Sequence, residues 1–279
     1  MKLDTKLAIL LATYNSARFL EAQLDSLFQQ TVRDWVLYIR DDGSIDSTLA
    51  IIAAYRKKYS NIVLLEDEKK GLGAMNSFMV LLAQVETDYY LFCDHDDVWL
   101  PNKIELTFNR LLDLEIQNPE TPIIVHTDLQ VVDQNLDLLH PSFWKMSAIK
   151  PHVIENKNLI QVFNCVTGCT MAFNQEVKEL AFPYVTETPM HDWWLAIVTV
   201  RNKGLIEHLP VSTILYRQHG NNEVGARNTS FSYFVNKIKN LKTTMKGHLE
   251  HIAFLQKIKG LGAMQYYYYK IYYTLIRKI

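Results

Sequence analysis

Short apolar runs alternate with segments of helical periodicity through the first half of this 279-residue chain, and this alternation restricts the fold more than any other feature. The runs of strand length cover residues 7–12, 35–40, 62–66 and 89–93, with a strand or pair of strands at 122–133. Apolar side chains recur at helical spacing within residues 16–30, 44–59, 73–85 and 101–115. Strands that alternate with helices of this length predict a mostly parallel, doubly wound α/β sheet.

The second half of the chain is less regular. It predicts a strand or edge element at 166–173, a helix at 190–204, and a strand that runs into a loop at 213–222. After Gly225 come two or three amphipathic helical stretches. The first apolar run is too short for a signal peptide, and no run reaches the roughly 18 apolar residues of a membrane span.

Polar or glycine-rich residues follow four consecutive predicted strands. They read TYN at 13–15, DDGS at 41–44, KKGLG at 69–73 and DHDD at 94–97. In doubly wound sheets, ligands bind at the carboxyl ends of the strands. These four segments therefore predict a binding site along one rim of the sheet.

The most acidic of these segments is the run from Asp94 to Asp97, which holds three aspartates directly behind the apolar strand YYLFC. A single Asp would suffice to cap the helix that begins near Pro101. Three carboxylates within four residues repel one another unless a cation lies between them. Oxygen ligands on such a turn suit Mg²⁺ or Mn²⁺, so we favour a divalent cation site over a capping turn.

Four further motifs each allow two interpretations. Asp42 belongs either to a turn-and-cap segment or to a site that contacts a nucleobase or ribose. The segment GLGAMNS at 71–77 is either a flexible helix entry or a close backbone approach to a sugar or phosphate. Asp192 either complements the dipole of the helix that it opens or acts as a general base at the rim. His219 is either a surface histidine or a ligand in an unusually polar strand end.

The three cysteines, Cys93, Cys165 and Cys169, form no CxxC pair. This predicts a reduced, cytosolic protein. Nothing beside Cys165 or Cys169 would stabilise a thiolate, so both are interpreted from the sequence as small packing residues.

These motifs together resemble the family 2 glycosyltransferases of the GT-A fold. The matching segments, in chain order, are LLATYN, IRDDGSIDST, GLGAMNSF, FCDHDDVWLP, VTGCTMAFN, MHDWWLA and YRQHGNN. They extend from Leu10 to Asn222, about three quarters of the chain. Each segment is modest alone, but seven in the right order are specific. The forms HDWWLA and YRQHGNN further resemble the bacterial rhamnosyltransferase-like branch, which builds cell-surface polysaccharides.

The resemblance implies an α/β fold with a GT-A-type, Rossmann-like mixed sheet and a C-terminal helical extension. It implies a catalytic domain at 1–225, with a donor-binding half at about 1–130 and an acceptor half at about 131–225, followed by a basic, Tyr-rich helical tail at 226–279.

The resemblance also implies roles for single residues. Asp192 matches the general base, although His191 stands where many relatives have Glu. Asp94 and Asp96 match the DxD element and, with His219, are the implied metal ligands. The implied donor-binding residues are Thr13, Tyr14, Asp42, Gly71, Asn76, Asp94, His95 and Asp96. The implied acceptor-binding residues are Asp97, Trp99, Gly168, Cys169, His191 and Trp193.

The activity implied is metal-dependent, inverting sugar transfer from a nucleotide-diphosphate sugar, with dTDP-rhamnose favoured, to a saccharide or lipid-linked saccharide acceptor. Mn²⁺ or Mg²⁺ is the implied cofactor, and the implied process is the synthesis of capsule or cell-wall polysaccharide. Two alternatives stay open: a UDP-hexose transferase for glucose or galactose, and a non-catalytic nucleotide-binding scaffold. A nucleotide-sugar pyrophosphorylase is disfavoured, since ATYNSARF after the first strand lacks glycine. No nucleic acid partner is expected, and a homodimer stays open.

Charge separates the tail from the rest of the chain. Residues 226–279 contain ten Lys or Arg and one acid, Glu250, which gives +9; with a total of −1, the remaining residues carry −10. Tyrosines cluster in QYYYYKIYY at 265–273. Two interpretations stay open: a helical hairpin that packs on its own protein, and a segment that binds anionic lipid on the inner face of the cell membrane.

Overall fold

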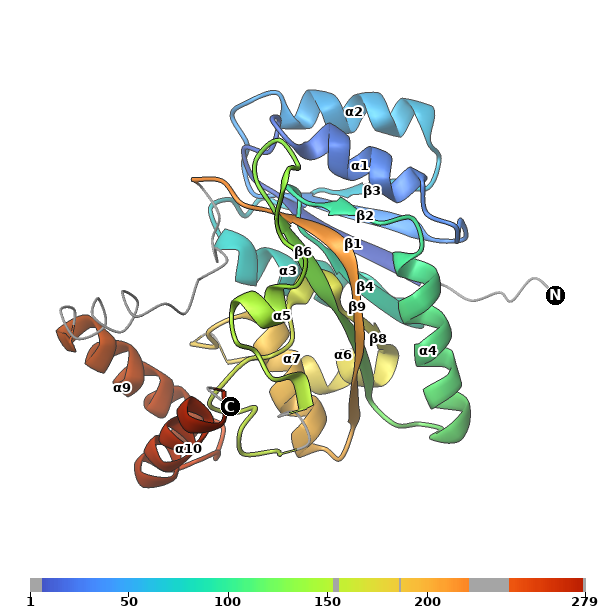
Figure 1. Ribbon diagram of the computed structural model, residues 1–279. Coiled ribbons are helices and arrows are strands. Elements are labelled where there is room, and N and C mark those ends of the chain that lie inside the picture. Colours follow the sequence, from blue (N-terminus) through green and yellow to red (C-terminus); the bar gives the residue numbers. More distant parts are fainter. Residues whose placement is uncertain (1–6, 153–155, 186, 221–240, 278–279) are drawn as a thin grey trace.

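The computed structural model describes residues 7–152, 156–185, 187–220 and 241–277, and within them it contains one mixed sheet (Figure 1). The strand order is β3-β2-β1-β4-β8-β6-β9-β5, with β7 paired to β6. The strands are β1 (Leu7–Thr13), β2 (Val36–Asp41), β3 (Ile62–Leu65), β4 (Tyr89–Cys93), β5 (Val98–Trp99), β6 (Ile123–Val132), β7 (Leu138–His140), β8 (Ala172–Asn174) and β9 (Leu205–Arg217).

The first four strands in this order are parallel, and β8 enters antiparallel between β4 and β6. The helices are α1 (Leu20–Phe28), α2 (Thr48–Lys58), α3 (Gly73–Gln84), α4 (Lys103–Gln117), α5 (Phe143–Met146), α6 (Gln175–Ala181), α7 (His191–Arg201), α9 (Leu241–Lys257) and α10 (Ala263–Ile276). The predicted α/β class with a mixed, doubly wound sheet and C-terminal helices is confirmed.

Two hydrophobic cores lie on the two faces of the sheet. Successive side chains of a strand point to opposite faces, so in β1 Leu10 joins the core under α3, α6 and α7, whereas Leu11 joins the core under α1, α2 and α4. Because β1 is buried on both faces, it reads in the sequence as an uninterrupted apolar run.

Two predicted elements of the second half differ from the structure. The strand predicted from residue 213 begins at Leu205, and Pro210 lies where the register of β9 shifts against β6, as expected for a proline inside a strand. The strand or edge element predicted at 166–173 contains a 3₁₀ turn, η2 (Gly168–Thr170), and becomes a strand only at Ala172, where the three residues of β8 begin.

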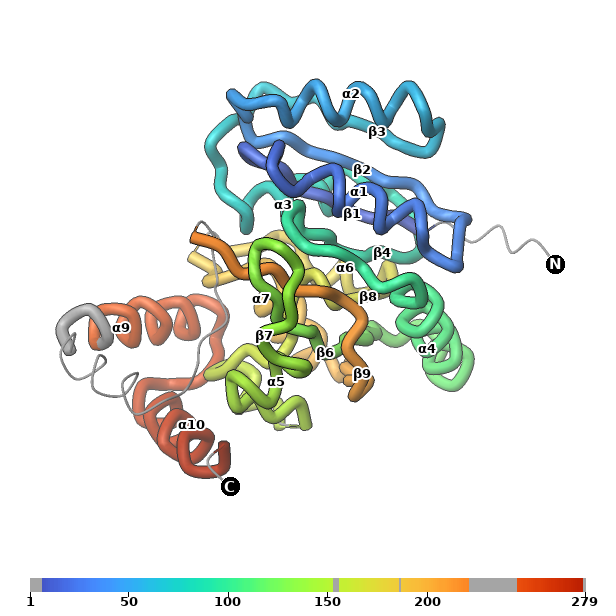
Figure 2. Tube along the Cα trace, turned by 45° about the horizontal axis from the view of Figure 1, so that its top comes forward, coloured from blue at the N-terminus to red at the C-terminus, as the bar shows by residue number. Residues whose placement is uncertain are grey.

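The described part of the tail packs on the body of the protein. Both views show α9 and α10 side by side beyond α7 (Figures 1 and 2). Phe254 and Leu255 of α9 join the core of α7, and the guanidinium of Arg277, which follows α10, donates to the Ser147 carbonyl at 2.5 Å. Residues 241–277 therefore form a helical hairpin that packs on its own protein. The predicted tail residues 226–240 lie outside the described residues, as do Asn221 and Asn222 of the YRQHGNN motif.

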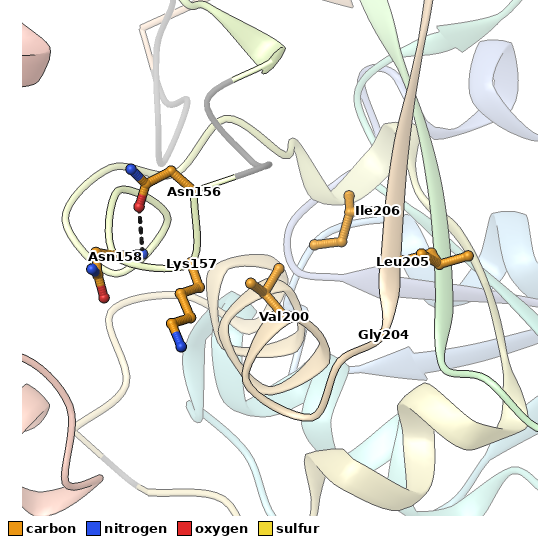
Figure 3. Close-up of a pocket in the computed structure, with 7 residues that line it drawn as sticks. All are labelled: Asn156, Lys157, Asn158, Val200, Gly204, Leu205 and Ile206. Carbon is orange, nitrogen blue, oxygen red and sulfur yellow. Dashed lines mark hydrogen bonds between the residues drawn. The ribbon is translucent and has the colours of Figure 1, made fainter.

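A hollow of about 610 Å³ lies at the start of β9 (Figure 3). It is lined by Asn156, Lys157, Asn158, Val200, Gly204, Leu205 and Ile206. Among the described residues that line the hollow, Lys157 is the sole titratable side chain, so they offer no set of groups for acid–base or metal chemistry.

Candidate active site

The rim predicted from the strand ends is present. The carboxyl ends of β1, β2 and β4 are neighbours because these strands are parallel and adjacent. β4 continues into the loop 94–97 and then into β5, which pairs with the end of β9. Two contacts fix this loop: the Arg217 backbone N–H donates to Asp97 Oδ1 at 3.0 Å, and the Arg217 guanidinium donates to the Asp96 carbonyl at 2.7 Å.

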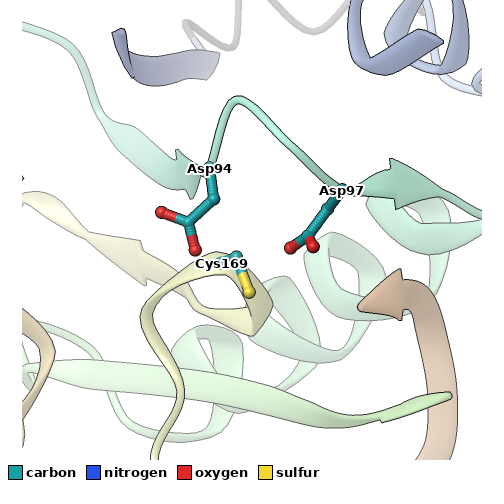
Figure 4. Close-up of side chains that lie close together, drawn as sticks. All are labelled: Asp94, Asp97 and Cys169. Carbon is teal, nitrogen blue, oxygen red and sulfur yellow. The ribbon is translucent and has the colours of Figure 1, made fainter. Parts of the chain in front are cut away.

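Asp94 and Asp97 stand at the two ends of the loop, and both side chains point toward Cys169 (Figure 4). Their ligand-type atoms all lie within 4.8 Å of one another. Asp97 is fully buried, and its Oδ2 accepts no hydrogen bond from a nitrogen or oxygen donor in the part of the chain that is described. Burial and the charges of Asp96 and Asp94 raise the pKa of Asp97 well above its usual value.

This set of donors fits a hard divalent cation. Burial and the charges of Asp94 and Asp97 raise the pKa of the Cys169 thiol well above its ordinary value. A protonated thiol is a poor metal ligand, which leaves the carboxylate oxygens. Such oxygens suit Mg²⁺ or Mn²⁺, and a cation beside Asp97 would offset the repulsion that raises its pKa.

The predicted metal ligands are brought together only in part. His219 Nε2 lies 2.8 Å from Asp96 Oδ2, and the His219 ring packs on Phe19 with ring centroids 4.8 Å apart. Among the described residues, the group within ligand distance joins Asp94 to Asp97 and Cys169 instead. Coordination by Asp96 and His219 stays a prediction.

Two of the predicted donor-binding residues lie at the carboxyl end of β1, where Thr13 is the last residue of the strand and Tyr14 follows it. Thr13 donates its hydroxyl to Asp41 at 2.9 Å, which ties the ends of β1 and β2 together. Tyr14 is 54% exposed. Its contact with a nucleobase stays a prediction that this exposure permits.

Asp42 organises the loop after β3. Its carboxylate accepts hydrogen bonds from the Arg40 guanidinium at 2.8 Å and from the backbone N–H groups of Leu72 and Gly73 at 3.0 and 2.8 Å. Gly71 donates its N–H to the Asp42 carbonyl at 3.0 Å and has φ +68, a conformation that favours glycine. In this arrangement Asp42 holds the glycine-rich loop against β2, and its predicted contact with a base stays untested.

The other predicted donor residues lie on the same side. Asn76 donates to the Leu72 carbonyl at 3.0 Å and accepts from the Tyr184 hydroxyl at 3.2 Å, so it joins α3 to the segment before α7. His95 is half-buried in the acidic loop. Their donor contacts stay predictions.

Asp192 is held in one orientation at the first turn of α7. Its Oδ2 accepts from the Gly168 N–H at 2.9 Å and its Oδ1 from the Asn164 side-chain amide at 3.0 Å. Burial raises the pKa of this carboxyl to about 7. A carboxylate with a pKa near 7 suits general base catalysis at neutral pH.

The 3₁₀ turn η2 connects the acidic loop to Asp192. Cys169 belongs to the group with Asp94 and Asp97, and the neighbouring Gly168 N–H bonds Asp192. A Cβ atom on Gly168 would lie 2.7 Å from His191 Nε2. A side chain at this position would therefore force the His191 ring to move.

The remaining predicted acceptor residues are largely covered. His191 is buried between Phe78 and Phe92, with ring centroids 4.3 and 4.8 Å away, and burial lowers its pKa to about 3. Trp99 is buried beneath Lys103, whose Nζ lies 4.1 Å from the ring centroid. Acceptor contacts by these residues, and by the buried Asp97, stay predictions.

Trp193 faces the tail. Its ring stacks on His251 of α9 at 4.6 Å between centroids. The tail thus contacts the residue next to Asp192, while the predicted acceptor contact of Trp193 stays untested.

Three side chains of the site were not assigned a role from the sequence. They are Arg40, Asn164 and Arg217. A signal existed for Arg40, because a guanidinium that ends the apolar run WVLYI before two aspartates predicts a buried ion pair. No comparable signal marks Asn164, which lies in an irregular segment.

The family model described as glycosyl transferase family 2 matches residues 8–179, more than half of the chain. A dTDP-rhamnosyl transferase, RfbG, of Shigella flexneri is 30% identical over 235 residues, which cover 79% of this chain and 75% of the relative.

A second relative is the UDP-Glc:alpha-D-GlcNAc-diphosphoundecaprenol beta-1,3-glucosyltransferase WfgD of Escherichia coli. It is 23% identical over 205 residues, which cover 73% of this chain and 74% of the relative.

Two solved structures share the fold. S. aureus TarS 1–349 in complex with UDP-GlcNAc matches with a TM-score of 0.58 at 19% identity, over 78% of this chain and 60% of TarS 1–349. The mannosyltransferase PcManGT of Pyrobaculum calidifontis, in complex with GDP-Man and Mn2+, matches with a TM-score of 0.60 at 14% identity, over 99% of this chain and 72% of that chain. These are GT-A glycosyltransferases, so the predicted GT-A fold is confirmed.

Proposed function

Because the chain belongs to glycosyl transferase family 2 and is a glycosyltransferase, we propose that it transfers a sugar by a metal-dependent, inverting single displacement. The observation that carries this proposal is the turn at Gly168 and Cys169, which joins the acidic loop to Asp192. The proposed cation site at Asp94 and Asp97 and the Asp192 carboxyl, with its pKa near 7, both contact this turn.

In this mechanism, Asp192 takes the proton of an acceptor hydroxyl while that oxygen bonds to the anomeric carbon. The bond from that carbon to the nucleotide diphosphate breaks on the opposite face, so the anomeric centre inverts. A divalent cation held by Asp94 and its neighbours would neutralise the charge that develops on the diphosphate. The transition state resembles an oxocarbenium ion, as in glycoside chemistry generally.

The favoured donor is dTDP-rhamnose, and the similarity to RfbG supports it. The alternative is a UDP-hexose, and the similarity to WfgD supports that class. The proposed acceptor is a saccharide or lipid-linked saccharide of cell-surface polysaccharide synthesis; WfgD, by its name, acts on a diphosphoundecaprenol-linked sugar. We place the proposed reaction at the cytoplasmic face of the cell membrane, with residues 226–279 binding anionic lipid.

A thermal-shift series tests the donor. The protein is heated with dTDP-rhamnose, UDP-glucose, UDP-galactose or GDP-mannose, each with and without Mn²⁺. A ligand at one hundred times its Kd adds roughly 2.7 kcal/mol to the free energy of unfolding, so the true donor should raise Tm by several degrees. A rise in Tm with dTDP-rhamnose alone supports rhamnosyl transfer. A rise in Tm only with UDP-sugars supports the UDP-hexose alternative.

A hydrolysis assay separates the enzyme from a nucleotide-binding scaffold. Slow, metal-dependent hydrolysis of the bound donor is expected, since water replaces the acceptor. Donor binding without hydrolysis, and without transfer to any saccharide tested, would favour the scaffold.

A further inference from the structure

One face of α10 is apolar and open to solvent. We define this α10 apolar face by Met264, Tyr268, Ile271, Tyr272 and Leu275, which are exposed by 90, 63, 62, 43 and 60%. At about 100° per residue, their positions fall within an arc of about 100° on one side of the helix. The face is therefore a continuous stripe.

The opposite side of α10 fixes the helix to the protein. Tyr266 and Tyr273 are buried there, about half a turn from the stripe. Asn158 donates to the Tyr269 hydroxyl at 2.7 Å, and Lys270 Nζ lies 4.4 Å from the centroid of the Phe163 ring. These contacts hold α10 on the protein through this side alone, and the α10 apolar face takes no part in them.

Charge decides what fits against this face. Residues 226–279 carry +9, and the Lys246 side chain of α9 is 77% exposed. Two such tails facing each other would repel, whereas an anionic surface would attract them. Among the described residues, no helix is long and apolar enough to cross a bilayer. A helix that presents tyrosines and aliphatic side chains to solvent, within a tail of net positive charge, suits the headgroup region instead.

We propose that the α10 apolar face is the surface that enters an anionic lipid membrane, with α9 and the basic residues of the tail along the headgroups. This inference rests on the proposed membrane binding by residues 226–279 and assigns the contact to one side of one helix. It fixes the orientation of the enzyme, because α9 packs on α7, the helix that carries Asp192.

Vesicle co-sedimentation tests the assignment with two matched variants. Ile271→Asp places a charge in the α10 apolar face, and Ile116→Asp changes an isoleucine of α4 that is 79% exposed on the body. With vesicles of phosphatidylcholine and phosphatidylglycerol, Ile271→Asp should lower the partition coefficient about tenfold or more. Ile116→Asp should leave it within about twofold. Binding of the unchanged protein should need phosphatidylglycerol and weaken when salt rises from about 50 mM to about 500 mM.

Three outcomes would overturn the proposal. The first is equal binding by Ile271→Asp and the unchanged protein. The second is no binding to anionic vesicles at low salt. The third is a dimer in solution that Ile271→Asp dissociates, which would make a second copy the occupant of the face. Circular dichroism of both variants confirms that each stays folded.

The result is separable from the proposed chemistry. Sedimentation needs neither donor nor metal, and Ile271→Asp should leave the donor-induced rise in Tm unchanged. A loss of donor binding with intact vesicle binding would count against the catalytic proposal alone.

Discussion

Asp192 has the two properties that a general base needs: a fixed orientation and a pKa near the working pH. Asn164 and Gly168 orient it, and burial raises its pKa to about 7. Asp192→Asn keeps the shape but cannot accept the proton, so kcat should fall by about 10²–10⁴ with donor binding preserved. Steady-state kinetics and the Tm shift with donor measure the two effects. A fall in kcat of less than about tenfold would favour the alternative interpretation, in which Asp192 only complements the dipole of α7.

The raised pKa of Asp192 also predicts opposite pH effects on activity and stability. The base must be ionised, so kcat should rise with pH and level off above about pH 7. In the unfolded chain this carboxyl ionises near its ordinary value of about 3.9. Between that value and about 7 the folded state holds a proton that the unfolded state has lost, so raising the pH lowers stability through this group. Denaturation in urea at several pH values should therefore show Asp192→Asn gaining stability relative to wild type up to about pH 7 and no further above it.

The acidic loop makes a separate prediction about the metal. Asp96→Ala should abolish transfer and remove metal-dependent nucleotide binding, because it takes a carboxylate from the loop that holds Asp94 and Asp97 and removes the oxygen that lies 2.8 Å from His219 Nε2. Transfer assays and Tm shifts with and without Mn²⁺ check this. Near-wild-type transfer without added cation would contradict the cation site.

At the residue scale, the sequence predicted which side chains are candidates for the site, but not their burial or their hydrogen-bond partners. Three aspartates behind a buried strand and an acid at a helix start are local patterns, so Asp94, Asp97 and Asp192 could be selected as candidates. The burial of Asp97 and the bond from Asn164 to Asp192 depend on segments 28 or more positions apart in the chain. No local pattern encodes such contacts.

At the scale of elements, the turn η2 joins the two halves of the site. A side chain at Gly168 would meet His191 Nε2 at 2.7 Å and Asp192 Cβ at 3.5 Å. Gly168→Ala should push the start of α7 outward, lower kcat, and cost about 1–3 kcal/mol of unfolding free energy. Gly247→Ala is the control, because its Cβ would meet nothing within 4 Å and alanine favours a helix by about 0.5–1 kcal/mol. Equal effects of the two changes on Tm and kcat would refute the role of this turn.

Strands that are buried on both faces could be predicted, because burial gives them an apolar sequence. Strands that exist only because they pair with a distant strand could not be predicted. β1 and β4 bury nearly every side chain, so each reads as an apolar run of strand length. β5 has two residues and exists because Val98 and Trp99 pair with β9. The first part of β9 contains Glu207, His208 and Pro210, which hide a strand that its parallel pairing with β6 defines.

At the scale of the whole molecule, the division of charge does not coincide with a division of the hydrophobic core. Residues 226–279 differ from the body by sign of charge, which led to the proposed boundary after residue 225. Yet Phe254 and Leu255 of α9 are buried in the same core as Trp194 and Leu195 of α7. Burial of a large apolar side chain contributes about 1.5–3 kcal/mol, so the described helices of the tail stabilise the helix that carries Asp192.

The boundary can be tested by cutting the chain after Gly225. The shortened protein should expose the α7 side chains that α9 covers, and it should lose the stacking contact between His251 and the Trp193 ring. Its free energy of unfolding should fall by several kcal/mol, on the order of two or three buried side chains, and transfer should fall with it because the support of α7 is lost. Cutting after Gly262 removes α10 but keeps α9, so it should cost less stability and spare more activity while abolishing vesicle binding. If the protein cut after Gly225 unfolds cooperatively at the wild-type Tm, residues 1–225 form an independent domain and the tail serves for attachment alone.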